Sequence, residues 1–223
     1  MGFGVAPPEE VRAGLQLGLG RGVETVAGVD EGKIVLSSGS SQTVLIEVAN
    51  IRLQGFHNVE NVQAAALAAV RFGIDPPVVA EAVSRFQGLP HRVQLVKVKD
   101  GIRYVDDSKA TNPHATLRAL KGLENVVLIA GGRAKGLDLS VLRPVAPALV
   151  GVVVMGEAAA ELRSVFAGLP LEEAADVEEA VRRAASMAGP GATVLLSPAC
   201  SSLDQYSSYA ERGDRFRKAV EAL

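Results

Sequence analysis

The sequence predicts an α/β fold, in which a mostly parallel sheet covered by helices on both faces follows a smaller β meander with two helices. Continuous apolar runs, such as residues 126–130, are typical of strands buried on both faces. Beyond about residue 93 these runs alternate with helical segments, which is the pattern of a parallel sheet. The first 55 residues instead carry short β-branched runs separated by turn sequences.

The chain has 223 residues and a net charge of −2, enough for one large or two modest domains. A boundary is predicted near Gly88-Leu89-Pro90, giving domains at residues 1–90 and 91–223. The balanced charge argues against non-specific nucleic-acid binding. One cysteine, no membrane-length apolar run and no basic stretch at the start predict a cytoplasmic protein without a signal peptide. A monomer is expected.

Three short strands and two helices are predicted in the first domain. The strands cover residues 23–26, 33–36 and 43–48, which are too few to bury a face without a covering element. They are expected to pack against the next helices or against a missing part of a parent protein. The helices cover residues 58–72, ended by Gly73, and 76–86, with Asp75 as N-cap and Pro76 in the first position.

The second domain begins with two strands, residues 93–98 and 102–105, joined by a hairpin because Asp100-Gly101 favours a tight turn. Asn112-Pro113 caps a helix that ends near residue 121. The remaining elements were predicted from apolar runs and helical periodicity. Buried strands are expected at residues 126–130, 150–155 and 192–196, and helices at 157–166, 177–187 and 209–223.

Three polar loops follow predicted strands, at residues 106–112, 131–136 and 197–204. In an open parallel sheet ligands bind at the carboxyl ends of the strands, so these loops are expected to converge on one site. Their lysines, hydroxyls and glycines suit phosphate or carboxylate groups. Each loop alone is also explained by turns and helix caps. The dinucleotide glycine fingerprint is absent from the sequence, which argues against an oxidoreductase. A Walker A motif is absent too.

Further candidates lie near the boundary. Asn58 and Asn61 are three residues apart at a helix start, so both amides can face one way, although Asn58 also suits a simple N-cap. Arg92 is placed either to bind an anion between domains or to be solvated. Cys200 is expected to be a buried, inert thiol, and the three histidines lack metal-ligand spacing with it.

Four motifs in this order resemble the Mur ligases of bacterial cell-wall synthesis. They are Gly-Phe-His-Asn-Val-Glu-Asn at residues 55–61, Leu-Pro-His-Arg at 89–92, Asp-Ser-Lys-Ala-Thr-Asn at 107–112, and Leu-Ser-Pro-Ala-Cys-Ser-Ser-Leu-Asp-Gln at 196–205. The last two resemble the D-glutamate-adding branch. The resemblance runs from about Gly55 to the C-terminus. It implies the last part of an ATP-binding central domain, without its P-loop, followed by a whole Rossmann-like domain that binds D-glutamate.

The resemblance also implies roles for individual residues. Lys109 would be catalytic, close to the phosphates or the transferring group. The nucleotide would be bound by Asn58, Asn61, Arg92 and Asp107, which would contact adenine, phosphates and ribose. D-Glutamate would be held by Thr111, Lys135, Ser202 and Leu203, with Tyr209 packing against it where the family often has phenylalanine. No metal ligand falls in this chain.

In the family, ATP and Mg²⁺ phosphorylate the carboxylate of UDP-N-acetylmuramoyl-L-alanine, and the D-glutamate amine attacks the acyl phosphate. Because the P-loop is missing, this chain alone is expected to be inactive. Two other functions stay open. One is a ligase similar to folylpolyglutamate synthase, which the Asp-Ser-Lys-Ala-Thr-Asn loop disfavours, and the other is a non-catalytic module that binds an acidic ligand.

Overall fold

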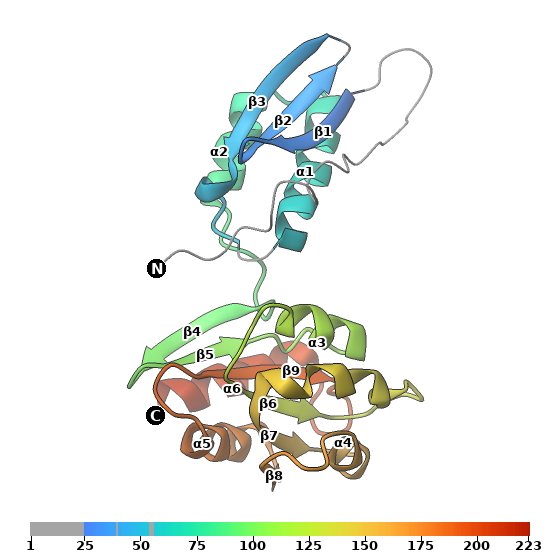
Figure 1. Cartoon of the computed structure of the whole chain (residues 1–223), viewed down its shortest axis with the longest axis vertical. Coiled ribbons are helices and arrows are strands. Elements are labelled where there is room, and N and C mark those ends of the chain that lie inside the picture. The colour runs from blue at the N-terminus through green and yellow to red at the C-terminus, as the bar shows by residue number, and fades with distance from the viewer. Residues whose placement is uncertain (1–24, 39, 54–55) are drawn as a thin grey trace. The chain divides into compact units, whose positions relative to one another are not determined.

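The computed structural model describes residues 25–38, 40–53 and 56–223 (Figure 1). The chain forms two compact units that divide between Gly88 and Leu89. Residues 23 and 24, the start of the first predicted strand, lie outside the described residues. No helix in the described ranges is long and apolar enough to cross a membrane.

The N-terminal unit contains the predicted meander and its two helices. Its elements are β1 (Thr25–Asp30), β2 (Lys33–Ser38), β3 (Ser41–Glu47), a 3₁₀ turn (Val48–Asn50), α1 (Phe56–Arg71) and α2 (Pro76–Arg85). The strands pair antiparallel in the order β1-β2-β3. Ile34 and Leu36 of β2 share a core with Leu67 of α1, so the helices supply the expected cover. Asp75 occupies the predicted N-cap position of α2, but its side chain makes no cap hydrogen bond.

The C-terminal unit contains a six-stranded sheet in the order β4-β5-β9-β6-β7-β8. Its strands are β4 (Gln94–Lys99), β5 (Ile102–Asp106), β6 (Val126–Gly131), β7 (Leu149–Met155), β8 (Leu171–Ala174) and β9 (Thr193–Ala199). β4 is antiparallel to β5, and all the other neighbours are parallel. The predicted mostly parallel sheet is confirmed.

Helices cover both faces of this sheet, as predicted. They are α3 (Pro113–Leu120), α4 (Ala159–Val165), α5 (Val177–Met187), α6 (Tyr209–Glu221) and the 3₁₀-helix η3 (Leu139–Ala148). On β6, Leu128 and Ala130 face the core beneath α3, α4 and η3, whereas Val127 and Ile129 face the core beneath α5 and α6. Side chains alternate between the faces of a strand, and here both faces are apolar, so the strand reads as one continuous apolar run.

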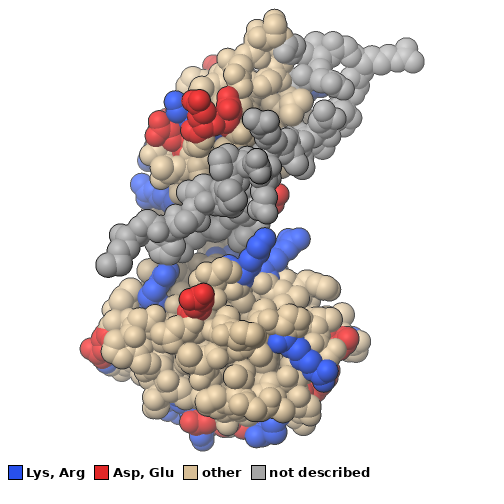
Figure 2. Space-filling view, in the orientation of Figure 1, with Lys and Arg blue, Asp and Glu red and all other residues tan. Residues whose placement is uncertain are grey.

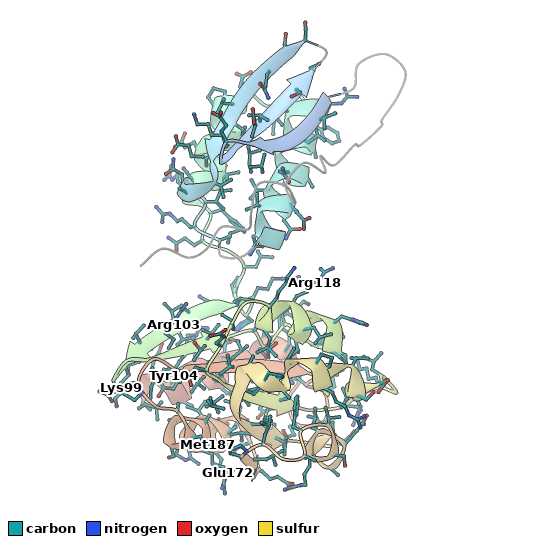
Figure 3. All side chains as sticks on the ribbon, viewed as in Figure 1. Lys99, Arg103, Tyr104, Arg118, Glu172 and Met187 are labelled. Atoms are coloured by element: carbon teal, nitrogen blue, oxygen red, sulfur yellow. The ribbon has the colours of Figure 1, made fainter. Side chains whose placement is uncertain are left out.

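The β4–β5 hairpin turns at Asp100 and Gly101, whose φ angles of 52° and 77° are both left-handed, as this turn type requires. Lys99 and Arg103 lie near this end of the hairpin (Figure 3). The other end of β5 carries Asp106 and the first polar loop.

Two elements of the C-terminal unit were not predicted. β8 has only four residues, Leu-Glu-Glu-Ala, and as an edge strand it lacks the continuous apolar run of the inner strands. η3 contains Pro144 and Pro147, which exclude an α-helix of that length, yet Leu139 and Leu142 are fully buried.

On the face of the C-terminal unit shown in Figure 2, lysine and arginine side chains form small separate groups. No continuous basic surface is visible on that face.

Candidate active site

Three loops follow neighbouring strands at the carboxyl edge of the parallel sheet. β9 lies between β5 and β6, so the loops that begin at Asp107, Gly132 and Cys200 are adjacent, and their predicted convergence is confirmed. The chain leaves β5 and β6 toward the face covered by α3 and η3, and leaves β9 toward α6 on the opposite face. Neighbouring connections that leave to opposite faces open a crevice, where α/β proteins bind ligands.

Asp106 organises the loop after β5. Its Oδ1 accepts a hydrogen bond from Ser108 N at 2.9 Å, and its Oδ2 lies 2.7 Å from His91 Nδ1. His91 fits there because residue 213 is glycine: a Cβ on Gly213 would lie 2.2 Å from His91 Nδ1. The carbonyl of His91 accepts from Lys109 N at 3.0 Å. The loop that carries Lys109 is therefore fixed to the first residues of the C-terminal unit.

Asp107 is buried, with 6% of its surface exposed. Its Oδ2 accepts from Ser197 Oγ at 2.7 Å, and its Oδ1 accepts from Val93 N at 3.3 Å. Burial raises the pKa of Asp107 to about 7, although these two hydrogen bonds and the Arg92 charge oppose the rise. This carboxyl therefore gains or loses a proton near neutral pH, and the exposed Arg92 guanidinium favours its charged form.

The loops after β6 and β9 are joined by their main chains. Arg133 N donates to Ser201 O at 2.8 Å, and Ser201 N donates to Arg133 O at 3.0 Å. This approach requires glycine at the end of β6. A Cβ on Gly131 would lie 1.9 Å from Met155 O, and one on Gly132 would lie 2.2 Å from Ser201 O.

Arg212, on the first half of α6, links all three loops. Its side chain is fully buried, and the guanidinium donates to Ser108 O at 2.9 Å and to Ser108 Oγ at 3.0 Å. It also donates to Gly131 O and to Cys200 O, each at 3.3 Å. Burial lowers the pKa of Arg212 to about 10, with Asp204 as the largest opposing charge. At neutral pH the group stays charged and cross-links the loops.

Lys109 lies against the start of α6. Its Nζ is 3.8 Å from the centroid of the Tyr209 ring, which is within range of a cation–π interaction. The Tyr209 carbonyl accepts from Ser108 Oγ at 2.7 Å, and His91 meets the Tyr209 ring edge-on at 6.1 Å. Lys109 and Tyr209, which were predicted from separate motifs, are thus direct neighbours.

The remaining predicted residues of this edge lie on the three loops: Thr111 follows β5, Lys135 follows β6, and Ser202 and Leu203 follow β9. Within the described part of the chain, the side chains of Thr111, Lys135 and Ser202 make no hydrogen bond or ion pair. Lys135 is exposed, Thr111 is half-buried and Ser202 is buried, so the Lys135 ammonium is the most accessible of the three unpaired groups.

Asn58 and Asn61 lie in the N-terminal unit, on the first turns of α1. Asn61 Nδ2 donates to Asn58 Oδ1 at 3.3 Å, so the two carboxamides do face one way. The simple N-cap reading of Asn58 is wrong, because α1 already begins at Phe56 and Asn58 is inside the helix. Gly55 and the side chains of Phe56 and His57 lie outside the described residues.

Cys200 is fully buried, and burial raises the pKa of its thiol to about 12, as expected for an inert cysteine. The described residues contain no group of three or more histidine, cysteine, aspartate or glutamate side chains placed to hold a metal ion. Nucleophilic thiol chemistry therefore has no support here.

Comparison with known proteins identifies the family. Residues 91–200 match the family model described as Mur ligase, glutamate ligase domain. Over 212 residues, or 94% of this chain, the sequence is 42% identical to UDP-N-acetylmuramoylalanine–D-glutamate ligase from Desulfosudis oleivorans. The chain belongs to the Mur ligase family. It spans about half of that relative, 46% of its length.

Solved Mur ligase structures share the fold. UDP-N-acetylmuramate-alanine ligase MurC from Thermotoga maritima matches 90% of this chain and 43% of its own, with a TM-score of 0.60 and 17% identity. A bifunctional folylpolyglutamate synthase/dihydrofolate synthase from Yersinia pestis, complexed with AMPPNP and Mn ion, matches 87% of this chain and 44% of its own, with a TM-score of 0.58 and 18% identity.

Two features of this Mur ligase site were missed from the sequence. Arg212 was not among the predicted site residues, because a charged residue on an amphipathic helix is usually exposed. The His91–Asp106 contact joins residues 15 apart and was not foreseen. The one available signal was Gly213, next to Arg212 on the predicted helix. A glycine leaves room for another residue to approach the helix closely, and His91 does so here.

Proposed function

We propose that this chain supplies the amino-acid-binding part of an ATP-dependent ligase that joins D-glutamate to UDP-N-acetylmuramoyl-L-alanine in peptidoglycan synthesis. The observation that carries this proposal is the set of unpaired Thr111, Lys135 and Ser202 side chains on three loops cross-linked by Arg212. An ammonium and two hydroxyls beside exposed main-chain amides suit carboxylates. The name of the relative that is 42% identical over 94% of this chain supports the choice of amino acid.

Within the proposed site, Lys135 pairs with one carboxylate of D-glutamate. Thr111, Ser202 and the main chain at Leu203, whose side chain is 52% exposed, donate to the amino acid. Tyr209 packs against the carbon chain while its ring holds the Lys109 ammonium.

The nucleotide contacts are proposed on both units. Asn58 and Asn61 present carboxamide donors and acceptors to adenine, Arg92 contacts the phosphates, and Asp107 accepts from the ribose hydroxyls. Lys109, the proposed catalytic residue, lies close to the phosphates or the transferring group. The AMPPNP bound to the Yersinia enzyme of the same fold supports a nucleotide site.

The proposed reaction has two steps. The carboxylate of UDP-N-acetylmuramoyl-L-alanine attacks the γ-phosphorus of ATP, and ADP leaves. The D-glutamate amine then attacks the acyl phosphate carbon, phosphate leaves, and the amine loses a proton as the amide forms. In the second step the three loops orient the amine, and the cations on them bind the carboxylates that do not react.

The described residues do not fit the Mg²⁺ ion that the family implies, because they offer no cluster of three ligands. The resemblance assigns the metal ligands and the P-loop to central-domain sequence that this chain does not contain. We therefore expect the 223-residue chain alone to release no phosphate from ATP in the presence of D-glutamate and UDP-N-acetylmuramoyl-L-alanine. The proposal also locates the reaction in the cytoplasm and treats the protein as a monomer, which light scattering measures directly.

Titration of the ¹⁵N-labelled chain with D- and L-glutamate tests the amino-acid site. D-Glutamate is expected to shift the amides near Lys135 and Ser202, and L-glutamate to bind more weakly. Lys135→Ala should weaken D-glutamate binding by about tenfold or more, the effect of losing one charge-assisted hydrogen bond. Lys121→Ala, which removes another exposed lysine at the end of α3, should leave the affinity unchanged.

Two results would contradict the proposal. If Lys135→Ala binds D-glutamate as tightly as the unmodified chain, the assignment of Lys135 is wrong. If L-glutamate binds better than D-glutamate, the alternative of a ligase similar to folylpolyglutamate synthase is favoured.

A further inference from the structure

The turn that carries Ser202 and Leu203 is closed by its own main chain. Gln205 N and Tyr206 N both donate to Ser202 O, at 3.2 Å and 2.8 Å. On its N-terminal side, Ser201 is bonded to the loop after β6. The exposed tip of the turn is therefore Leu203, between two anchored ends.

Three consecutive side chains, those of Asp204, Gln205 and Tyr206, anchor the C-terminal side of this turn. Each forms a hydrogen bond with a main-chain group in the loops after β7 and β8. Asp204 Oδ2 accepts from Glu157 N at 3.1 Å, Gln205 Nε2 donates to Ala175 O at 2.7 Å, and Tyr206 Oη accepts from Val177 N at 2.9 Å.

The loop after β7 is shaped to receive Asp204. A Cβ on Gly156 would lie 2.3 Å from Asp204 Oδ2 and 3.0 Å from Gly132 Cα. Gly156 also has a φ of 69°, which side chains rarely adopt. Only glycine at this position allows the carboxylate to reach Glu157 N.

Tyr206 is anchored at the start of α5. Val177 N is one of the amides in the first turn that have no partner within the helix, and the buried Tyr206 hydroxyl satisfies it. The ring packs in the core beneath α5 and α6, with the Arg215 guanidinium 5.4 Å from its centroid. This anchor therefore joins the turn to a rigid element.

We propose that Asp204, Gln205 and Tyr206 form a three-point clamp of positioning residues, which holds the Ser202 hydroxyl and the Leu203 amide in the geometry that binds a carboxylate of the amino acid. The clamp rests on the proposed function, because it acts on the same amino-acid site. Holding a binding turn in its bound geometry avoids the entropic cost of ordering it when the ligand arrives. The three main-chain groups to which the clamp is bonded, on Glu157, Ala175 and Val177, lie outside the three loops that supply the ligand-binding side chains.

The test compares clamp variants with a variant that loses similar hydrogen bonds elsewhere. Gln205→Ala and Tyr206→Phe each remove one anchor. Lys97→Ala removes bonds from Lys97 Nζ to Val220 O and Glu221 O, at the other end of α6. D-Glutamate affinity is measured by titration of the full chain. Hydrogen exchange of the residue 206 amide, which donates to Ser202 O, reports the turn, and thermal melting reports global stability.

Each clamp variant is expected to raise the Kd for D-glutamate by about fivefold or more and to speed exchange of the residue 206 amide. Lys97→Ala should leave the Kd and the exchange rate unchanged, even if its melting temperature falls as far as those of the clamp variants. Clamp variants that bind D-glutamate as tightly as the unmodified chain would overturn the clamp while leaving the site intact.

If D-glutamate shifts no amide of the unmodified chain, the proposed function fails, and the clamp fails with it as a device for amino-acid binding. Accelerated exchange of the residue 206 amide in the variants would then show a structural role only. The two failures are therefore distinguishable in one set of samples.

Discussion

Arg212→Met should destabilise the C-terminal unit strongly, because the buried guanidinium holds three loops together. Methionine fills much of the same volume but offers no donor. Without the guanidinium, the carbonyl oxygens of Ser108, Gly131 and Cys200 each lose a partner inside the protein.

The size of the effect follows from these groups. A buried polar atom left without a partner costs about 1–3 kcal/mol. The lower end applies, because the bonds to Gly131 and Cys200 are long, at 3.3 Å, and because methionine removes the cost of burying a charge. Three carbonyls at about 1 kcal/mol each give a loss of about 3 kcal/mol, a large part of a typical domain's stability.

Urea unfolding followed by far-UV circular dichroism measures this loss, which should lower the midpoint of the C-terminal unit by about 1–2 M. Arg215→Met is the matched control on the same helix. Arg215 is partly exposed and pairs with Glu178, so its loss should cost less than about 1 kcal/mol. If the two variants unfold at the same urea concentration, Arg212 does not cross-link the loops as described.

Three further outcomes are expected. The folded-state pKa of Asp107, about 7 against an ordinary 3.8, means that the native state holds a proton which the unfolded state releases, so stability falls as pH rises from about 4 to 7. The free energy of unfolding of Asp107→Asn should therefore exceed that of the unmodified chain by up to about 4 kcal/mol at pH 8 and by nothing at pH 4, as urea titrations measure. If the stabilities of the two chains run parallel from pH 4 to pH 8, the burial effect is contradicted. Cys200 should react with a maleimide at pH 8 at least about a hundredfold more slowly in the native chain than in urea, and equal rates would show that the thiol is accessible. Gly131→Ala should prevent stable folding, since its Cβ would lie 1.9 Å from Met155 O, while Gly189→Ala, with open space around it, should melt like the unmodified chain.

Much of the fold was predictable because its strands bury both faces. The apolar run at residues 126–130 and its counterparts identified the inner strands to within a few residues. One predicted cap is confirmed, since the Asn112 side chain accepts from Ala115 N at the start of α3. Asp75 occupies the predicted N-cap position of α2 without a side-chain cap bond, and Asn58 lies inside α1. The exceptions were β8 and η3. β8 is an edge strand and needs no continuous apolar run, and the prolines of η3 made its buried segment resemble an irregular loop.

The candidate site was predictable in outline but not in its internal connections. Lysines and hydroxyls after three strands indicated a shared edge, because the carboxyl ends of parallel strands meet there. Burial of Asp107 and of Arg212 was not predictable, since charged side chains are seldom buried and no local pattern distinguishes the exceptions. Main-chain contacts such as Arg133 with Ser201 depend on strand order, which the sequence alone does not specify.

The central place of β9 has a consequence for how the protein is made. Thr193–Ala199 follows the other five strands of this sheet in the chain, yet it must insert between β5 and β6, which are synthesised much earlier. Until then those two strands present unpaired edges, and a nascent chain halted before residue 193 contains neither a closed sheet nor the middle loop of the crevice. A chain that ends before Thr193 therefore lacks the strand that joins β5 to β6, and its C-terminal unit cannot form the sheet.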